Sequence, residues 1–142
     1  MKHKINVLVI DAQGGGIGRQ LVAAVKEAFA GAFVTAVGTN GAATSAMLKA
    51  GADQAATGEN SVLVACRSAD VIMGPIGITI ADAMVGEITP KMATAVGQSG
   101  AKRILIPVSH CDNIIAGVPD ASIATLVRQA VQVLRSIAEA EE

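Results

Sequence analysis

A short apolar run that leads straight into a cluster of glycines constrains the fold of this chain most. Residues 5–10 read INVLVI, and residues 11–18 (DAQGGGIG) follow without a break. Nearly continuous β-branched runs of this length are typical of parallel strands that are covered on both faces. Beyond the glycines, apolar residues recur at intervals of three and four up to Gly31. This segment is therefore predicted to form a strand, a glycine loop and an amphipathic helix.

The rest of the sequence repeats this alternation of strand and helix. We expect strands at residues 33–37, 53–56, 71–73 and 103–108, and a strand at residues 114–118 that returns beside the fifth. Side chains that cap helices predict helix starts after Asn40, Thr57 and Thr89, the last with Pro90 at the first helical position. A short helix is expected around residues 78–87, and a final amphipathic helix from Asp120 onward.

This order of elements predicts the α/β class, with one three-layer, Rossmann-like, doubly wound domain over residues 1–142. Its sheet is expected to be mostly parallel, with about five strands and one antiparallel edge strand. Ligands of such sheets bind outside the carboxyl ends of the strands, where the strand order reverses. Glycine and polar residues follow the predicted strands, so this edge of the sheet is the candidate site.

Composition excludes several classes of partner. Eleven Lys and Arg against twelve Asp and Glu give a net charge of -1, and the basic residues are scattered, so we expect no nucleic-acid face. No apolar stretch approaches the ~18 to 20 residues of a membrane-spanning helix. The two cysteines have no CxxC spacing and there is no export signal, which predicts a cytoplasmic protein. Hydrophobic residues make up 51% of the chain, which favours a homo-oligomer with an apolar interface.

The glycine cluster is the strongest candidate for a binding site. Glycines let a backbone approach a ligand closely, and the free N–H groups of a helix N-terminus attract phosphate. The sequence therefore predicts a nucleotide or another phosphate-containing small molecule here. The expected contacts are Asp11, Gln13, Gly14, Gly15, Gly16, Ile17 and Gly18. Two alternatives stay open: a tight turn without a ligand, and an Asp11 carboxylate that only orders the loop.

The cluster matches nucleotide-binding motifs in part. Read from Gly14, the dinucleotide pattern GxGxxG places Arg19 where the last Gly or Ala belongs. In another register, Gly16 and Gly18 resemble the loop of short-chain dehydrogenases, with Ala12 in place of the first glycine. Those enzymes depend on a Tyr and Lys pair, and this chain has no Tyr, so their chemistry is excluded.

Two further segments are predicted to reach the same ligand. Thr39 and Asn40 follow the second strand, but neither is the carboxylate expected for NAD nor the Arg expected for NADP. The cofactor is therefore left open between NAD(P) and other nucleotides. A second glycine turn faces the first across the predicted switch point, either as a ligand contact or as a simple turn. It consists of Gly74, Pro75, Ile76 and Gly77.

Catalytic candidates are weak. His110 and Cys111 share a loop after the fifth predicted strand, but adjacent side chains usually point apart, and an activated thiol needs a base within ~3 Å. No metal site is expected, because metal ions need three or four convergent ligands. A small enzyme that uses His110 and Cys111 beside the glycine loop is one alternative function. A partner subunit without a small ligand is another.

Several separate motifs, taken in order, resemble a small bacterial family. They are DAQGGGIG (residues 11–18), GTNGAATSAMLKAGAD (38–53), ATGEN (56–60), GPIGI (74–78), EITPKM (87–92) and ILIP (104–107). Together they cover most of the chain and are similar to the domain-of-unknown-function family 3842. The resemblance implies a cytoplasmic Rossmann-like domain without an assigned activity, and it provides no catalytic residue.

Overall fold

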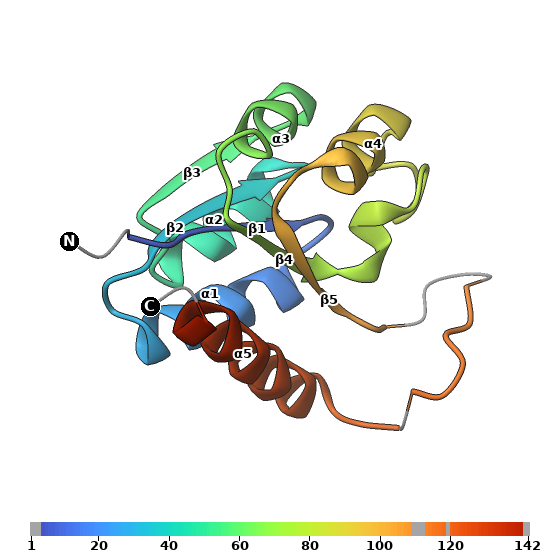
Figure 1. Cartoon of the computed structure of the whole chain (residues 1–142). Helices are drawn as coiled ribbons and strands as arrows, with labels where there is room; N and C mark the ends of the chain where they lie inside the picture. Colours follow the sequence, from blue (N-terminus) through green and yellow to red (C-terminus); the bar gives the residue numbers. More distant parts are fainter. Residues whose placement is uncertain (1–3, 109–112, 119, 141–142) are drawn as a thin grey trace.

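Strands and helices alternate along the chain, as the sequence pattern predicted. The structure is a computed structural model that describes residues 4–108, 113–118 and 120–140 (Figure 1). The strands in the described residues are β1 (Asn6–Asp11), β2 (Phe33–Gly38), β3 (Gln54–Thr57), β4 (Val71–Pro75) and β5 (Lys102–Ile106). The helices are α1 (Gly16–Ala28), α2 (Gly41–Lys49), α3 (Glu59–Ala65), α4 (Pro90–Gln98) and α5 (Ile123–Ala140), with a 3-10 turn η1 (Ile76–Thr79).

All of the described strands pair in parallel in one sheet of order β3-β2-β1-β4-β5. The chain builds outward from β1 through β2 to β3, then crosses back to β4 on the other side of β1. The strand order therefore reverses between β1 and β4, and the crevice of a doubly wound sheet opens at the carboxyl ends of these two strands. The α/β class and the five-stranded parallel sheet are confirmed.

Successive side chains of a strand point to opposite faces of the sheet, so the buried residues of the strands form two cores, one on each face. Val7 and Val9 of β1 belong to the core that also includes residues of α1, α2 and α5, whereas Leu8 and Ile10 belong to the core with α3 and α4. Figure 1 shows α1 and α5 on one side of the sheet and α3 and α4 on the other. Both faces of β1 are buried, which explains its nearly continuous apolar sequence.

Two of the predicted helix starts are confirmed by side-chain caps. Asn40 Oδ1 accepts a hydrogen bond from the backbone N–H of Ala43 at 2.9 Å. Thr89 Oγ1 accepts one from the N–H of Met92 at 3.1 Å, and Pro90 is the first residue of α4. These caps fix where α2 and α4 begin, and therefore which residues are left in the loops at the candidate site.

Three sequence predictions about element boundaries are wrong. Thr57 ends β3 and the cap of α3 is Gly58, which makes no side-chain cap bond. Residues 114–118 form a turn with Gly117 at φ +79° rather than an antiparallel strand, and Ile114 is 91% exposed, so the run has no apolar surface to cover it. The last helix begins at Ile123 rather than Asp120, because the Ser122 hydroxyl accepts the Thr125 N–H at 3.2 Å.

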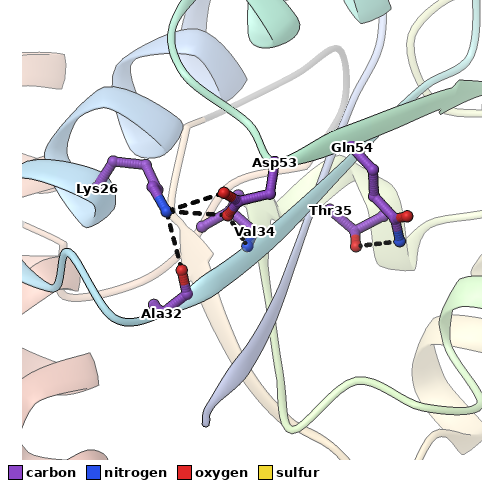
Figure 2. Close-up of polar contacts among 6 residues, drawn as sticks. All are labelled: Lys26, Ala32, Val34, Thr35, Asp53 and Gln54. Atoms are coloured by element: carbon purple, nitrogen blue, oxygen red, sulfur yellow. Dashed lines mark hydrogen bonds and ion pairs between the residues drawn. The ribbon is translucent and has the colours of Figure 1, made fainter.

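A polar cluster fixes the opposite edge of the sheet, at the amino end of β2 (Figure 2). Lys26 Nζ, near the end of α1, donates to Asp53 Oδ2 and to the Ala32 carbonyl, both at 2.9 Å. Asp53 Oδ2 also accepts the Val34 N–H at 2.8 Å, which ties the start of β3 to β2. The Val34 bond and Lys26 hold the pKa of Asp53 below its usual value of 3.8. The cluster thus anchors the end of α1 that lies away from the glycine loop.

Candidate functional site

The glycine loop connects the carboxyl end of β1 to α1 in a tight turn. Gln13 at φ +51° and Gly15 at φ +72° adopt left-handed backbone conformations, and the Gly15 N–H donates to the Ala12 carbonyl at 3.0 Å. Gly15 is the residue that precedes the first turn of α1. The loop therefore places the N-terminus of α1 at the carboxyl edge of the sheet, beside the point where the strand order reverses.

The side chain of Asp11 holds the glycine loop in its conformation through two hydrogen bonds. Its side chain is 4% exposed, with Oδ1 accepting the Ala12 N–H at 2.8 Å and Oδ2 accepting the Gly18 N–H at 2.7 Å. A carboxylate on an N–H of the first helical turn also interacts favourably with the helix dipole. Asp11 therefore anchors the loop, and it is also one of the residues that line the pocket at this edge of the sheet.

The glycines of the loop divide into two kinds. A Cβ added to Gly18 would lie 2.5 Å from Met47 Sδ and 2.8 Å from the Asp11 Cβ, and one added to Gly15 would lie 3.0 Å from the Ala43 backbone. The fold itself requires glycine at these two positions. A Cβ added to Gly14 or Gly16 would meet no atom within 4 Å. Packing therefore does not require these two glycines, and their backbone faces open space.

A pocket of about 400 Å³ lies against this open backbone. The N–H groups of Gly14, Gly16 and Ile17 have no hydrogen-bond partner among the described residues, and all three residues line the pocket. Pro75 at the end of β4 forms the facing wall, so the pocket lies across the switch point between β1 and β4. Its remaining lining residues are Asp11, Ala12, Gln13, Gln20, Met84, Val108 and Ile123.

Thr39 and Asn40 lie beside the glycine loop, but their side chains are bound by Glu87. Glu87 Oε1 accepts hydrogen bonds from Thr39 Oγ1 at 2.6 Å, Asn40 Nδ2 at 2.8 Å and the Gln13 backbone N–H at 2.9 Å. Asn40 Nδ2 also donates to the Gln13 carbonyl at 2.9 Å. The bonds from Thr39 and the Gln13 backbone stabilise the charged form, so the pKa of Glu87 is lowered from its usual value of 4.5.

The second glycine turn contributes to the pocket through one residue. Pro75 lines it, whereas Ile76 and Gly77 belong to η1 and are not among its lining residues. Gly74 has a structural role, because an added Cβ would collide with the Ile10 carbonyl oxygen of the neighbouring strand. The prediction that this turn faces the glycine loop is supported by the parallel pairing of β1 with β4.

The remaining candidates are the thiols and a metal site. His110 and Cys111 lie outside the described residues. Cys66 is 5% exposed in the core beside α4, and burial raises the pKa of its thiol, so it is a small buried residue of that core. In the described part of the chain, no three His, Cys, Asp or Glu side chains converge as metal ligands, and no helix has the length and hydropathy of a membrane span.

Sequence reasoning missed Glu87. The residue precedes the cap of α4, and it contacts Thr39 across 48 positions of sequence. No local pattern marks this contact, because it depends on β4 lying beside β1 and on the course of the segment that follows η1. The only sequence indication is negative: the second strand ends without the carboxylate that a ribose site needs.

Comparison with known proteins gives a family and a distant structural neighbour. No curated protein matches the chain. The structure is similar to a nucleoside-diphosphate-sugar epimerase from Pseudomonas aeruginosa, with 12% sequence identity and a TM-score of 0.49. That match covers 96% of this chain and 48% of the epimerase, so the chain spans about half of that structure's length.

The family assignment rests on sequence. The model of the family described as Domain of unknown function (DUF3842) matches residues 6–139, from β1 to the last turn of α5. The matched range includes the glycine loop, the second glycine turn and Glu87. The resemblance inferred from the ordered motifs is confirmed, and the chain belongs to the DUF3842 family.

Proposed function

We propose that this protein binds a nucleotide or another phosphorylated metabolite in the pocket above the glycine loop. The observation that carries the proposal is the set of three unpartnered N–H groups, on Gly14, Gly16 and Ile17, that line one pocket at the switch point. Such groups at a helix N-terminus are suited to phosphate oxygens, and the helix dipole adds to the attraction.

Asp11 does not oppose this function, because its carboxylate is bound deeper in the first turn of α1. It accepts the N–H of Gly18, the third residue of the helix, and leaves the N–H groups of Gly16 and Ile17 to the pocket. The buried carboxylate holds the loop in the conformation that exposes those two groups. Asp11 thus fixes the conformation of the loop, and the N–H groups of Gly16 and Ile17 are available to the ligand.

The openness of Gly14 and Gly16 supports the same function. Replacing glycine by alanine stabilises a fold by about 0.4–1 kcal/mol where the backbone conformation suits alanine, so a glycine that packing does not require is a net cost to the fold. Gly16 is the first residue of α1, where a side chain would extend into the pocket region. Absence of a side chain there leaves room for a ligand against the backbone.

The test is a thermal-shift panel of AMP, GMP, NAD⁺, NADP⁺, FAD and ribose 5-phosphate on the wild type and two matched variants. Gly16→Asp and Gly41→Asp each add a carboxylate at the first position of a helix, with no atom within 4 Å of the new Cβ, but only Gly16 lines the pocket. A probe at about 100 times its Kd stabilises by about 2.7 kcal/mol, which raises Tm by about 6–12 °C.

We expect at least one probe to stabilise the wild type and the Gly41→Asp variant, and to lose its effect on Gly16→Asp. The added carboxylate repels phosphate but is favourable to the helix dipole, so the Gly16→Asp variant remains folded. Equal shifts for both variants would place any bound probe elsewhere. No shift with any probe would contradict the proposal and favour the partner subunit without a small ligand.

A further inference from the structure

The segment between η1 and α4 forms a compact loop, and we call its residues 80–88 the strap. Its backbone closes on itself, because Asp82 N–H donates to the Ile88 carbonyl at 2.7 Å and Ile88 N–H donates to the Ala83 carbonyl at 3.2 Å. Met84 and Ile88 are buried in the core that contains α3 and α4, so two apolar side chains anchor the strap to the domain.

The strap holds an unfavourable backbone conformation. Asp82, Met84 and Val85 all have positive φ, and a β-branched residue such as Val85 at φ +59° is rare because its side chain collides with the backbone. Val85 is also 90% exposed, so burial of its own side chain does not offset this cost. Such conformations persist where surrounding contacts hold them, and they concentrate at binding sites.

The two carboxylate oxygens of Glu87, near the end of the strap, have different surroundings. Oε1 accepts hydrogen bonds from Thr39 Oγ1, Asn40 Nδ2 and the Gln13 N–H. Oε2 accepts no hydrogen bond from the residues that the structure describes, and the side chain is only partly buried. The bonds to Oε1 therefore fix the carboxylate, while its second oxygen is open to a further donor.

Glu87 lies where doubly wound sheets bind ribose. In such sheets an Asp or Glu at the end of the second strand accepts a hydroxyl group of the nucleotide ribose. Here β2 ends at Gly38, and the next residue, Thr39, donates to Glu87 at 2.6 Å. The carboxylate that the second strand lacks in sequence is thus provided by the strap, 48 positions further along the chain.

The same contacts place Glu87 beside the proposed phosphate site. The N–H of Gln13 donates to Glu87, whereas the N–H of the next residue, Gly14, has no partner among the described residues and lines the pocket. In a nucleotide, one methylene group links the ribose ring to the 5′-phosphate. A single nucleotide can therefore contact the glycine loop through its phosphate and Glu87 through its ribose.

The charge of Glu87 decides which riboses it accepts. The bonds from Thr39 and the Gln13 backbone hold the pKa of Glu87 below its usual value of 4.5, so the carboxylate is ionised at neutral pH. An ionised carboxylate is a strong acceptor for a hydroxyl group but repels a phosphate group on the same ribose. The three groups that bind Oε1 are uncharged and do not offset this repulsion.

We propose that Glu87 is the ribose-binding residue of this site and that the ligand is a 5′-phosphorylated ribonucleoside with free 2′- and 3′-hydroxyl groups. This inference rests on the proposed phosphate site at the glycine loop. Glu87 Oε2 accepts a ribose hydroxyl, and Thr39 and Asn40 are positioning residues that hold the carboxylate. The class includes both mononucleotides and dinucleotides, because the contact involves only one ribose.

Isothermal titration with matched nucleotides tests this inference on the wild type. AMP and GMP are each compared with a 2′,3′-dideoxy form, which lacks both ribose hydroxyls, and with a 2′-phosphorylated form. We expect AMP or GMP to bind at least about tenfold more tightly than either modified form, because a hydrogen bond to a charged group is lost in one and replaced by charge repulsion in the other. This comparison requires no substitution in the protein.

Two variants then assign the preference to the carboxylate. Glu87→Ala removes the acceptor and should reduce the preference for the unmodified over the dideoxy form to less than about threefold. Glu87→Gln removes only the charge and should restore most of the affinity for the 2′-phosphorylated form. Glu27→Gln, at an exposed position of α1, is the control and should retain both preferences. A purely structural role of Glu87 would weaken matched nucleotides equally and leave their ratio unchanged.

The possible results separate this inference from the proposed function. Far-UV circular dichroism verifies that each variant is folded. Equal binding of the unmodified and dideoxy forms to the wild type, or an unchanged ratio in Glu87→Ala, would overturn the inference and leave the phosphate site standing. Binding of ribose 5-phosphate without binding of any nucleotide would do the same. Absence of binding by all of these probes would overturn the proposed function and this inference with it.

Discussion

The backbone N–H of Gly18 donates to the Asp11 carboxylate at 2.7 Å, so the last residue of β1 is bound to the first turn of the helix that follows the glycine loop. The same carboxylate accepts the Ala12 N–H through its other oxygen. One buried side chain thus joins the strand, the loop and the helix. This contact holds the glycine loop and its exposed N–H groups in place, so we expect Asp11 to be essential to the proposed site.

Loss of the Asp11 carboxylate should therefore destabilise the fold. We expect Asp11→Ala to lower the free energy of unfolding by about 2–3 kcal/mol, because two buried backbone N–H groups lose a charged acceptor. Urea denaturation followed by circular dichroism measures this difference. Glu27→Ala, which removes an exposed carboxylate from the same helix, should change stability by less than about 0.5 kcal/mol. A loss of similar size in both variants would contradict the role given to Asp11.

Two neighbouring glycines should respond oppositely to the same substitution. Gly18→Ala places a Cβ against Met47 and Asp11, and we expect it to destabilise by about 1–3 kcal/mol. Gly16→Ala adds a Cβ in open space at the start of α1, and we expect it to stabilise by about 0.5–1 kcal/mol. Chemical denaturation of the two variants side by side measures both effects. Comparable destabilisation by both would show that Gly16 is also required by packing.

The Lys26 and Asp53 pair predicts a dependence of stability on pH. The pKa of Asp53 is lower in the folded state than its usual value of 3.8, so folding favours the charged form. Its contribution is therefore fully present above about pH 4 and is lost as pH falls through the folded pKa. Because the side chain is 32% exposed, we expect it to be at most about 1 kcal/mol.

Unfolding free energies of wild type and Asp53→Asn between about pH 7 and about pH 3 test this prediction. The difference between the two proteins should be largest near neutral pH and should shrink as pH falls below about 4. The variant Asp120→Asn, which removes another exposed carboxylate, is the control for the loss of one negative charge. A wild-type advantage over Asp53→Asn that persists or grows at low pH would be inconsistent with a lowered pKa.

Local sequence patterns predicted much of this fold because these elements depend on interactions between residues that are close in sequence. The apolar runs of β1 and β2, the caps Asn40 and Thr89 and the stripe of α5 each depend on residues within a few positions of one another. The strand predicted at residues 114–118 was wrong for the opposite reason. A short apolar run becomes a strand only where another strand offers an edge and side chains cover it, and neither condition can be read from the run alone.

The sequence predicted the glycine-loop backbone of the proposed site, but not the tertiary contacts of its side chains. The sequence indicated Gly14, Gly16 and Ile17 because a glycine-rich turn before a helix exposes N–H groups, and these residues line the pocket of the proposed site. The division of the glycines could not be predicted, since Gly18 is required by Met47 from another helix. Glu87 was missed because its bonds to Thr39 and Asn40 depend on tertiary structure that joins distant segments.

The most direct test of the phosphate site is a two-dimensional ¹H–¹⁵N NMR titration with AMP, ribose 5-phosphate and inorganic phosphate. If the exposed N–H groups of the glycine loop bind phosphate, the largest changes in amide chemical shift will occur at Gly14, Gly16 and Ile17. The amide of Gly18, which is bound to Asp11, should change less. Titrations in which none of these three amides moves, or in which the largest changes lie away from the glycine loop, would contradict the account.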